Sequence, residues 1–65
     1  MRSQKTSQTL TLEDAIEIHR RRWLGEAQHV LAAAFGVNPA RISEVLIGKR
    51  FPEARDLALK GQIAQ

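Results

Sequence analysis

Glycine and proline between positions 36 and 48 constrain the backbone of this chain more than any other feature of its sequence. Gly36 follows an apolar stretch with helical spacing and suits the positive φ of a tight turn. Asn38 and Pro39 favour a new helix start, because Asn caps free backbone N–H groups and proline at the first helical position loses no hydrogen bond. Gly48 then ends that helix. The segment therefore predicts two short helices joined by a tight turn.

Small and branched side chains in this segment favour close packing of the two helices. Ala32 lies where the first helix meets the second, and its small side chain allows a close approach. Ile42 and Val45, three residues apart, are expected to pack on Leu31 and Phe35. The expected core, with the large indole of tryptophan as its anchor, is Trp23, Leu31, Phe35, Val37, Ile42 and Val45.

Apolar residues at three- and four-residue intervals predict helices over most of the chain. The expected helices cover residues 12–24, 26–35, 39–47 and 53–60. No segment has the alternation of a strand, so we expect an all-α fold with a three-helix core and a short C-terminal fourth helix. The domain is expected over residues 11–60, with a flexible N-terminal arm at 1–10 and a C-terminal tail at 61–65.

The apolar stripe of the first expected helix decides where its side chains lie. Trp23 is on the stripe and is expected at the centre of the core, whereas Ile18 is on the opposite side and is expected at the surface. Thr11 is the expected N-cap. Glu17 stands one turn before Arg21 and is expected to pair with it.

Composition excludes several classes of function. The 65 residues include no cysteine, and the two histidines lack metal-ligand spacing, so neither a disulfide nor a structural metal is expected. There is no nucleophile elbow or glycine-rich phosphate loop, so we expect no enzyme and no cofactor. No apolar run is long enough to span a membrane, and the polar first ten residues lack a signal peptide, so a cytoplasmic protein is expected.

The charge balance favours a nucleic-acid partner, and one motif points in the same direction. Lys and Arg outnumber Asp and Glu by ten to seven, which gives a net charge of +3 and a pI near 10.2. The 21-residue segment that starts at Gln28, with Ala32, Gly36, Ile42 and Val45 at its key positions, resembles the helix-turn-helix of DNA-binding transcriptional regulators. Both phage-repressor-like and resolvase-like families share this pattern, and the residues leave the subfamily open.

The resemblance implies that residues 39–47 form a recognition helix that enters the major groove of DNA. The residues then expected to face the bases are Asn38, Ala40, Arg41, Ser43, Glu44 and Ile47. Arg41 can donate a bidentate pair of hydrogen bonds to guanine, and Glu44 can accept one from a cytosine amine. An ion pair between Glu44 and Arg41 is the alternative for that carboxylate.

Phosphate contacts are expected at the helix ends and in the arm. Gln28, Lys49 and Arg50 stand at helix ends, where they would reach phosphates. Arg2 and Lys5 in the arm are expected to act in the same way.

These features predict sequence-specific binding of double-stranded DNA by a small transcriptional regulator. A homodimer is expected, because one small module contacts only a few base pairs. The dimer forms either in free solution or only on DNA. The alternative is a protein-binding module, of antiactivator or antitoxin type, that uses the same helices to grip a protein partner. Steep salt dependence of binding distinguishes the first function from the second.

Overall fold

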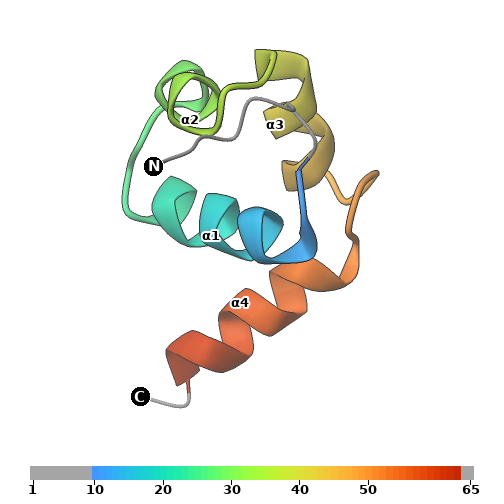
Figure 1. The fold of residues 1–65 in the computed structure, drawn as a ribbon. Coiled ribbons are helices and arrows are strands. Elements are labelled where there is room, and N and C mark those ends of the chain that lie inside the picture. The colour runs from blue at the N-terminus through green and yellow to red at the C-terminus, as the bar shows by residue number, and fades with distance from the viewer. Residues whose placement is uncertain (1–9, 64–65) are drawn as a thin grey trace, which may run out of the picture.

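The computed structural model describes residues 10–63, and this part of the chain forms four helices and no strand (Figure 1). The helices are α1 (Leu12–Trp23), α2 (Gln28–Phe35), α3 (Pro39–Leu46) and α4 (Glu53–Ile63). The expected all-α fold with a fourth C-terminal helix is confirmed. None of the described helices is long and apolar enough to cross a membrane. Most of the predicted arm, including Arg2 and Lys5, lies outside the described residues.

Four helix boundaries differ from the expected ones. Helix α1 ends at Trp23, with Leu24 as its C-cap. Helix α2 begins at Gln28, two residues late, because the backbone of Ala27 is still extended, with φ −73° and ψ 155°. Helix α3 ends at Leu46, and Ile47 is its C-cap. Helix α4 continues past Gly61, whose φ is outside the left-handed region that makes a glycine end a helix.

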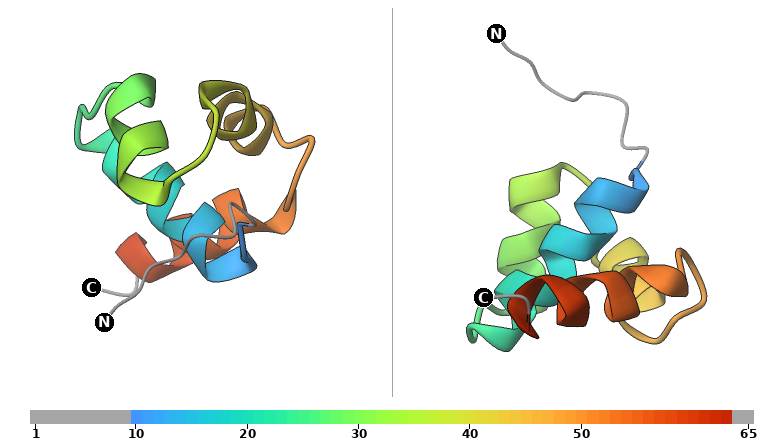
Figure 2. Two further views of the ribbon diagram at one scale, coloured as in Figure 1. Left: turned by 45° about the horizontal axis from the view of Figure 1, so that its top comes forward. Right: turned by 90° about the horizontal axis from the view of Figure 1, so that it is seen from below.

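Helix α1 is the centre of the domain and contacts the other three helices. It lies between the α2–α3 pair on one side and α4 on the other, and the view from below shows α4 crossing in front of it (Figure 2). Its start is fixed by a capping box. The Thr11 hydroxyl accepts from the backbone N–H of Asp14, and the Asp14 carboxylate accepts from the N–H of Thr11, both at 3.1 Å.

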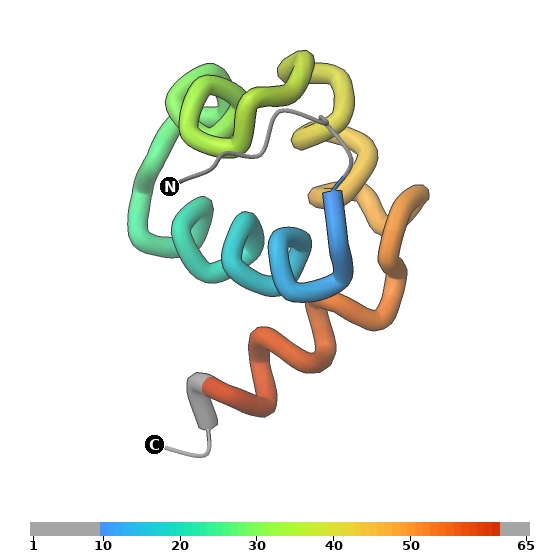
Figure 3. The backbone as a smooth tube through the Cα atoms, viewed as in Figure 1, coloured from blue at the N-terminus to red at the C-terminus, as the bar shows by residue number. Residues whose placement is uncertain are grey.

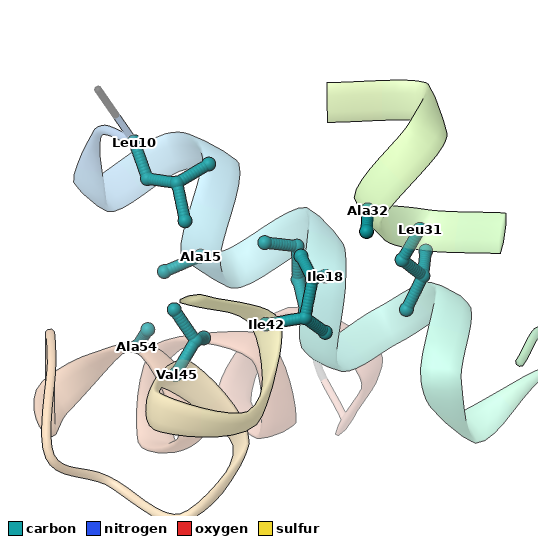
Figure 4. Packing of buried hydrophobic residues seen from close by; sticks show 8 residues of the cluster. All are labelled: Leu10, Ala15, Ile18, Leu31, Ala32, Ile42, Val45 and Ala54. Carbon is teal, nitrogen blue, oxygen red and sulfur yellow. The ribbon is translucent and has the colours of Figure 1, made fainter. Parts of the chain in front are cut away.

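The core gathers small and branched side chains from all four helices. Ile18, Leu31, Ile42 and Val45 are its largest fully buried side chains. Leu10, assigned to the arm by the sequence analysis, is also buried against this cluster. The members drawn in Figure 4 are Leu10, Ala15, Ile18, Leu31, Ala32, Ile42, Val45 and Ala54.

Two core assignments on α1 were wrong. Ile18 is fully buried, whereas the side chain of Trp23 is 41% exposed. The buried side of α1 runs through Ala15, Ile18 and His19, because α1 contacts all three other helices and more of its surface is covered than a single apolar stripe. Trp23 is the last residue of the helix, and its ring lies beside that of His19, at 5.8 Å between centroids. Among the other expected core residues, Phe35 and Val37 are partly buried.

The connection from α3 to α4 contains one unusual backbone conformation. Phe51 has a positive φ of 51°, which costs a non-glycine residue about 1–2 kcal/mol. Its ring packs against the core cluster, and its carbonyl accepts from the N–H of Ala54 at 2.9 Å. Burial of the ring offsets the strain, and the chain bends sharply into α4, as the tube view shows (Figure 3).

Candidate nucleic-acid interface

Helices α2 and α3 are joined by the tight turn that the glycine spacing predicts. Gly36 has a left-handed backbone with φ 70°. The N–H of Val37 donates to the carbonyl of Ala32 at 3.0 Å, and the N–H of Gly36 donates to that of Ala33 at 3.3 Å. These two bonds form a Schellman motif, which satisfies the last carbonyls of α2. The turn therefore needs glycine at position 36.

The start of α3 uses one of the predicted base-contacting side chains. Asn38 is the N-cap, and its Oδ1 accepts from the backbone N–H of Ala40 at 2.8 Å. Pro39 follows at the first helical position. The cap predicted from sequence is confirmed. Since Oδ1 is held by the helix, only the amide nitrogen of Asn38 is left to donate to a base.

Helix α3 has two opposite faces. Ile42 and Val45 are completely buried on the inner face. On the outer face Ala40 is exposed, Glu44 is half-buried, and Ile47, which caps the helix, is 74% exposed. These outer residues lie four and three apart, which places them along one side of a helix. Arg41 stands at the edge of this face and is exposed, while Ser43 on its other edge is half-buried.

The end of α3 bends back on itself. Gly48 has φ 86°, its N–H donates to the carbonyl of Val45 at 3.1 Å, and the N–H of Lys49 donates to that of Glu44 at 2.9 Å. The N–H of Arg50 also donates to the Glu44 carbonyl, at 3.2 Å. This second Schellman motif holds two cationic residues, both exposed, close to the outer face of α3.

Glu44 is an ion-pair partner of two arginines. Its Oε1 lies 2.6 Å from Nε of Arg50 and 3.4 Å from Nη1 of Arg41. The hydrogen bond from Arg50 lowers the pKa of Glu44, and the charges of Arg41 and Lys49 lower it further. The expected pairing with Arg41 is present but long, and the shorter contact with Arg50 was not anticipated. We name Arg41, Glu44 and Arg50 the α3 charge cluster.

The N-terminus of α2 lacks a side-chain cap. Its N-cap residue is Ala27, which has no side chain that can accept a hydrogen bond. Gln28, the predicted phosphate contact, is the first residue of the helix and is half-buried. Free N–H groups and the positive end of the helix dipole make such a terminus favourable for a phosphate.

Another ion pair joins the last turn of α1 to the connection that leads into α2, and it was not predicted from the sequence. Arg21 does not pair with Glu17 as expected: its Nη2 lies 2.8 Å from Oε1 of Glu26. The guanidinium also lies over the ring of Phe35, 5.7 Å from its centroid. Arg22 donates to the carbonyl of Glu26 at 3.3 Å. One feature of the sequence indicates this ion pair: Glu26 directly follows a glycine, and the turn there brings Glu26 back toward the end of α1.

The arrangement has no features of a metal centre. Within the described residues, no group of three or more His, Asp and Glu side chains is placed to hold a metal ion. Comparisons of the chain with protein-family models, curated proteins and solved structures found no match. A functional assignment therefore depends on the residues and the geometry described above.

Proposed function

We propose that this protein binds double-stranded DNA sequence-specifically, as a small transcriptional regulator, with α3 as its recognition helix. The outer face of α3 carries the proposal. It is exposed along the helix through Ala40 and Ile47, directly opposite the buried Ile42 and Val45. An α-helix with its side chains is roughly 10–12 Å across and fits a major groove about 12 Å wide.

The charge of this region supports the same function. Between residues 39 and 50, Arg41, Lys49 and Arg50 stand against the single acid Glu44, so this segment has a net charge of +2 out of +3 for the chain. Cationic side chains at a helix end neutralise phosphates and release counterions. The proposed phosphate contacts are Lys49, Arg50 and the uncapped start of α2 at Gln28.

Within the α3 charge cluster the two arginines have different roles in this proposal. Arg41 makes the long contact to Glu44, 3.4 Å, and its side chain is 46% exposed, so it can leave the carboxylate and donate to a guanine edge. Arg50 makes the short contact, 2.6 Å, and is held in position for a phosphate. Glu44 thus acts as the orienting group for Arg50.

Selection of bound duplexes from a random library, followed by titration, tests the proposal. Binding to the selected duplex and to a scrambled duplex is measured by fluorescence anisotropy at several salt concentrations. We expect a clear preference for the selected duplex and a steep loss of affinity with salt. Lys60→Ala is the control for removal of one cation, because Lys60 is exposed on α4, across α1 from the α2–α3 pair. No enrichment of any sequence would contradict the proposal.

Two copies on a symmetric site form part of the proposed function. One module of this size contacts few base pairs, and two copies about 10 base pairs apart supply the missing specificity. Sedimentation of the protein with and without the selected duplex measures the stoichiometry. A footprint too short for two copies would overturn this part of the proposal.

A protein-binding module is the second candidate, and one observation favours it. Ile47 is 74% exposed on the outer face of α3, and Leu24 at the end of α1 is 80% exposed. Apolar side chains in such positions suit a protein interface. Binding through them responds weakly to salt, so the same titrations separate the two candidates.

A further inference from the structure

A hollow of about 410 Å³ opens between the C-terminal end of α3 and the first turn of α4, on the side where both meet α1. Its apolar wall includes Leu46, Ile47 and Pro52, and its polar groups come from His19, Arg55 and Asp56. A space of this size is within the range of small-molecule sites.

The imidazole of His19 lines the hollow and has an unsatisfied nitrogen. The residue is only 3% exposed, and its Nε2 has no hydrogen-bond partner. The ring makes a hydrogen bond to the backbone of Val45. A backbone carbonyl only accepts, so the proton is on Nδ1 and Nε2 of the neutral ring is an acceptor. Nε2 itself has almost no exposed surface, so the imidazole is part of the wall of the hollow and reports on what binds beside it.

Opposite charges stand side by side on the wall formed by α4. Arg55 and Asp56 are adjacent in sequence and both exposed. Within the described residues, neither takes part in an ion pair. The guanidinium of Arg55 suits a carboxylate, and the carboxylate of Asp56 suits an ammonium group. A simple anion would be repelled by Asp56, and a simple cation by Arg55.

We propose that this hollow binds a free amino acid with an aliphatic or aromatic side chain. The carboxylate of the ligand pairs with Arg55, and its ammonium group pairs with Asp56. Its side chain covers Leu46, Ile47 and Pro52. A zwitterion is the class of small molecule that pairs with the cation and the anion together.

Direct binding measurements test this site without DNA, so their outcome is independent of the proposed function. Trp23 is the only tryptophan, 5.8 Å from His19 between ring centroids, so its fluorescence reports on the imidazole. The two histidines of the chain give separate proton resonances, with the exposed His29 as internal reference. The probes are L-leucine and L-phenylalanine, with leucinamide and the hydroxy-acid analogue of leucine as ligands that each lack one charge.

We expect saturable shifts of the His19 resonances and of Trp23 fluorescence at millimolar leucine or phenylalanine, with His29 unchanged. Leucinamide and the hydroxy acid should bind at least tenfold more weakly than leucine. Arg55→Gln and Asp56→Asn, both surface substitutions, should each weaken leucine binding at least tenfold, while Lys60→Gln on the same helix leaves it unchanged. Circular dichroism establishes that each variant is folded. Absence of saturable shifts with both amino acids, or equal binding of leucine and its two analogues, would overturn the proposal.

Discussion

Oε1 of Glu44 lies 2.6 Å from Nε of Arg50, although the two are six positions apart in sequence. The left-handed Gly48 turns the chain back, so that the N–H groups of Lys49 and Arg50 both reach the carbonyl of Glu44. One residue on the outer face of α3 therefore holds the following turn through both its backbone and its side chain.

Glu44→Gln is expected to strengthen binding to all duplexes a few-fold and to reduce the preference for the selected one. The substitution removes an anion from the proposed DNA face, and it also releases the arginines that this anion orients. Glu53→Gln makes the same change of net charge at an exposed position on α4 and should have little effect. Anisotropy titrations on selected and scrambled duplexes measure both quantities. Tighter binding with an unchanged preference for the selected duplex would contradict the orienting role of Glu44.

Gly48→Ala is expected to destabilise the fold by about 1 kcal/mol, because an L residue is strained in the left-handed region. The strain is purely one of backbone, since a Cβ at Gly48 would meet no atom within 4 Å. Gly61→Ala is the matched control: its φ is not left-handed, and the substitution within α4 should stabilise by roughly 0.5 kcal/mol. Urea unfolding measures the change in the free energy of unfolding for both variants. A change in the same direction in both would contradict this explanation.

The helices were predicted well because cap, proline and glycine residues act on the backbone directly beside them. Asn38 caps α3, Pro39 starts it, and Gly36 and Gly48 take the left-handed conformations that end α2 and α3. The helix spacing could not tell Trp23 from Ile18. Periodicity shows which residues share one side of a helix, whereas burial depends on which sides the neighbouring helices cover, and α1 is packed against all three other helices.

The residues on the outer face of α3 could be predicted from the sequence, but the ion-pair partners of these residues could not. The outer face of α3 follows from the buried Ile42 and Val45 opposite it. The contact of Glu44 with Arg50 depends on the exact path of the turn at Gly48, which residue spacing along α3 does not describe. The hollow beside His19 likewise needs α4 in place, and no local pattern around that histidine indicates it.

Ala32→Leu is expected to destabilise the fold by about 1–3 kcal/mol through overpacking. Ala32 is 4% exposed and belongs to the core cluster, at the end of α2 that leads into the turn. Ala33→Leu adds the same atoms on the exposed side of the same helix and should change the stability by at most about 0.5 kcal/mol. Thermal unfolding of the two variants provides the comparison. Similar unfolding midpoints would show that the core around Ala32 can accommodate a larger side chain.

The stability of the fold is expected to fall as the solution is acidified below pH 6.5. Burial lowers the pKa of His19 from 6.5, and the charge of Arg55 lowers it further, against a hydrogen bond to Val45 that raises it. The unfolded chain then binds a proton more readily than the folded one. The stabilisation is complete above pH 6.5 and is lost as the pH falls from there toward the lowered pKa.

Urea unfolding followed by Trp23 fluorescence across this pH range measures the effect. His19→Gln should flatten the pH dependence above pH 5, where carboxylates contribute little, and His29→Gln at an exposed position should leave it unchanged. Stability that rises on acidification through pH 6.5 would show that the folded state holds the proton on His19 more tightly than the unfolded chain.

Substitutions of the cations near α3 separate base contacts from phosphate contacts. Arg41→Ala should weaken binding to the selected duplex by about 1–3 kcal/mol and relax the preference at one base pair, because a bidentate contact to guanine is lost. Lys49→Ala should weaken binding to every duplex alike and reduce the slope of log affinity against log salt by about one, because one fewer counterion is released. Lys60→Ala, on α4, should change neither quantity. Equal losses on selected and scrambled duplexes for Arg41→Ala, with no effect of Lys49→Ala, would mean that α3 does not lie in the major groove as proposed.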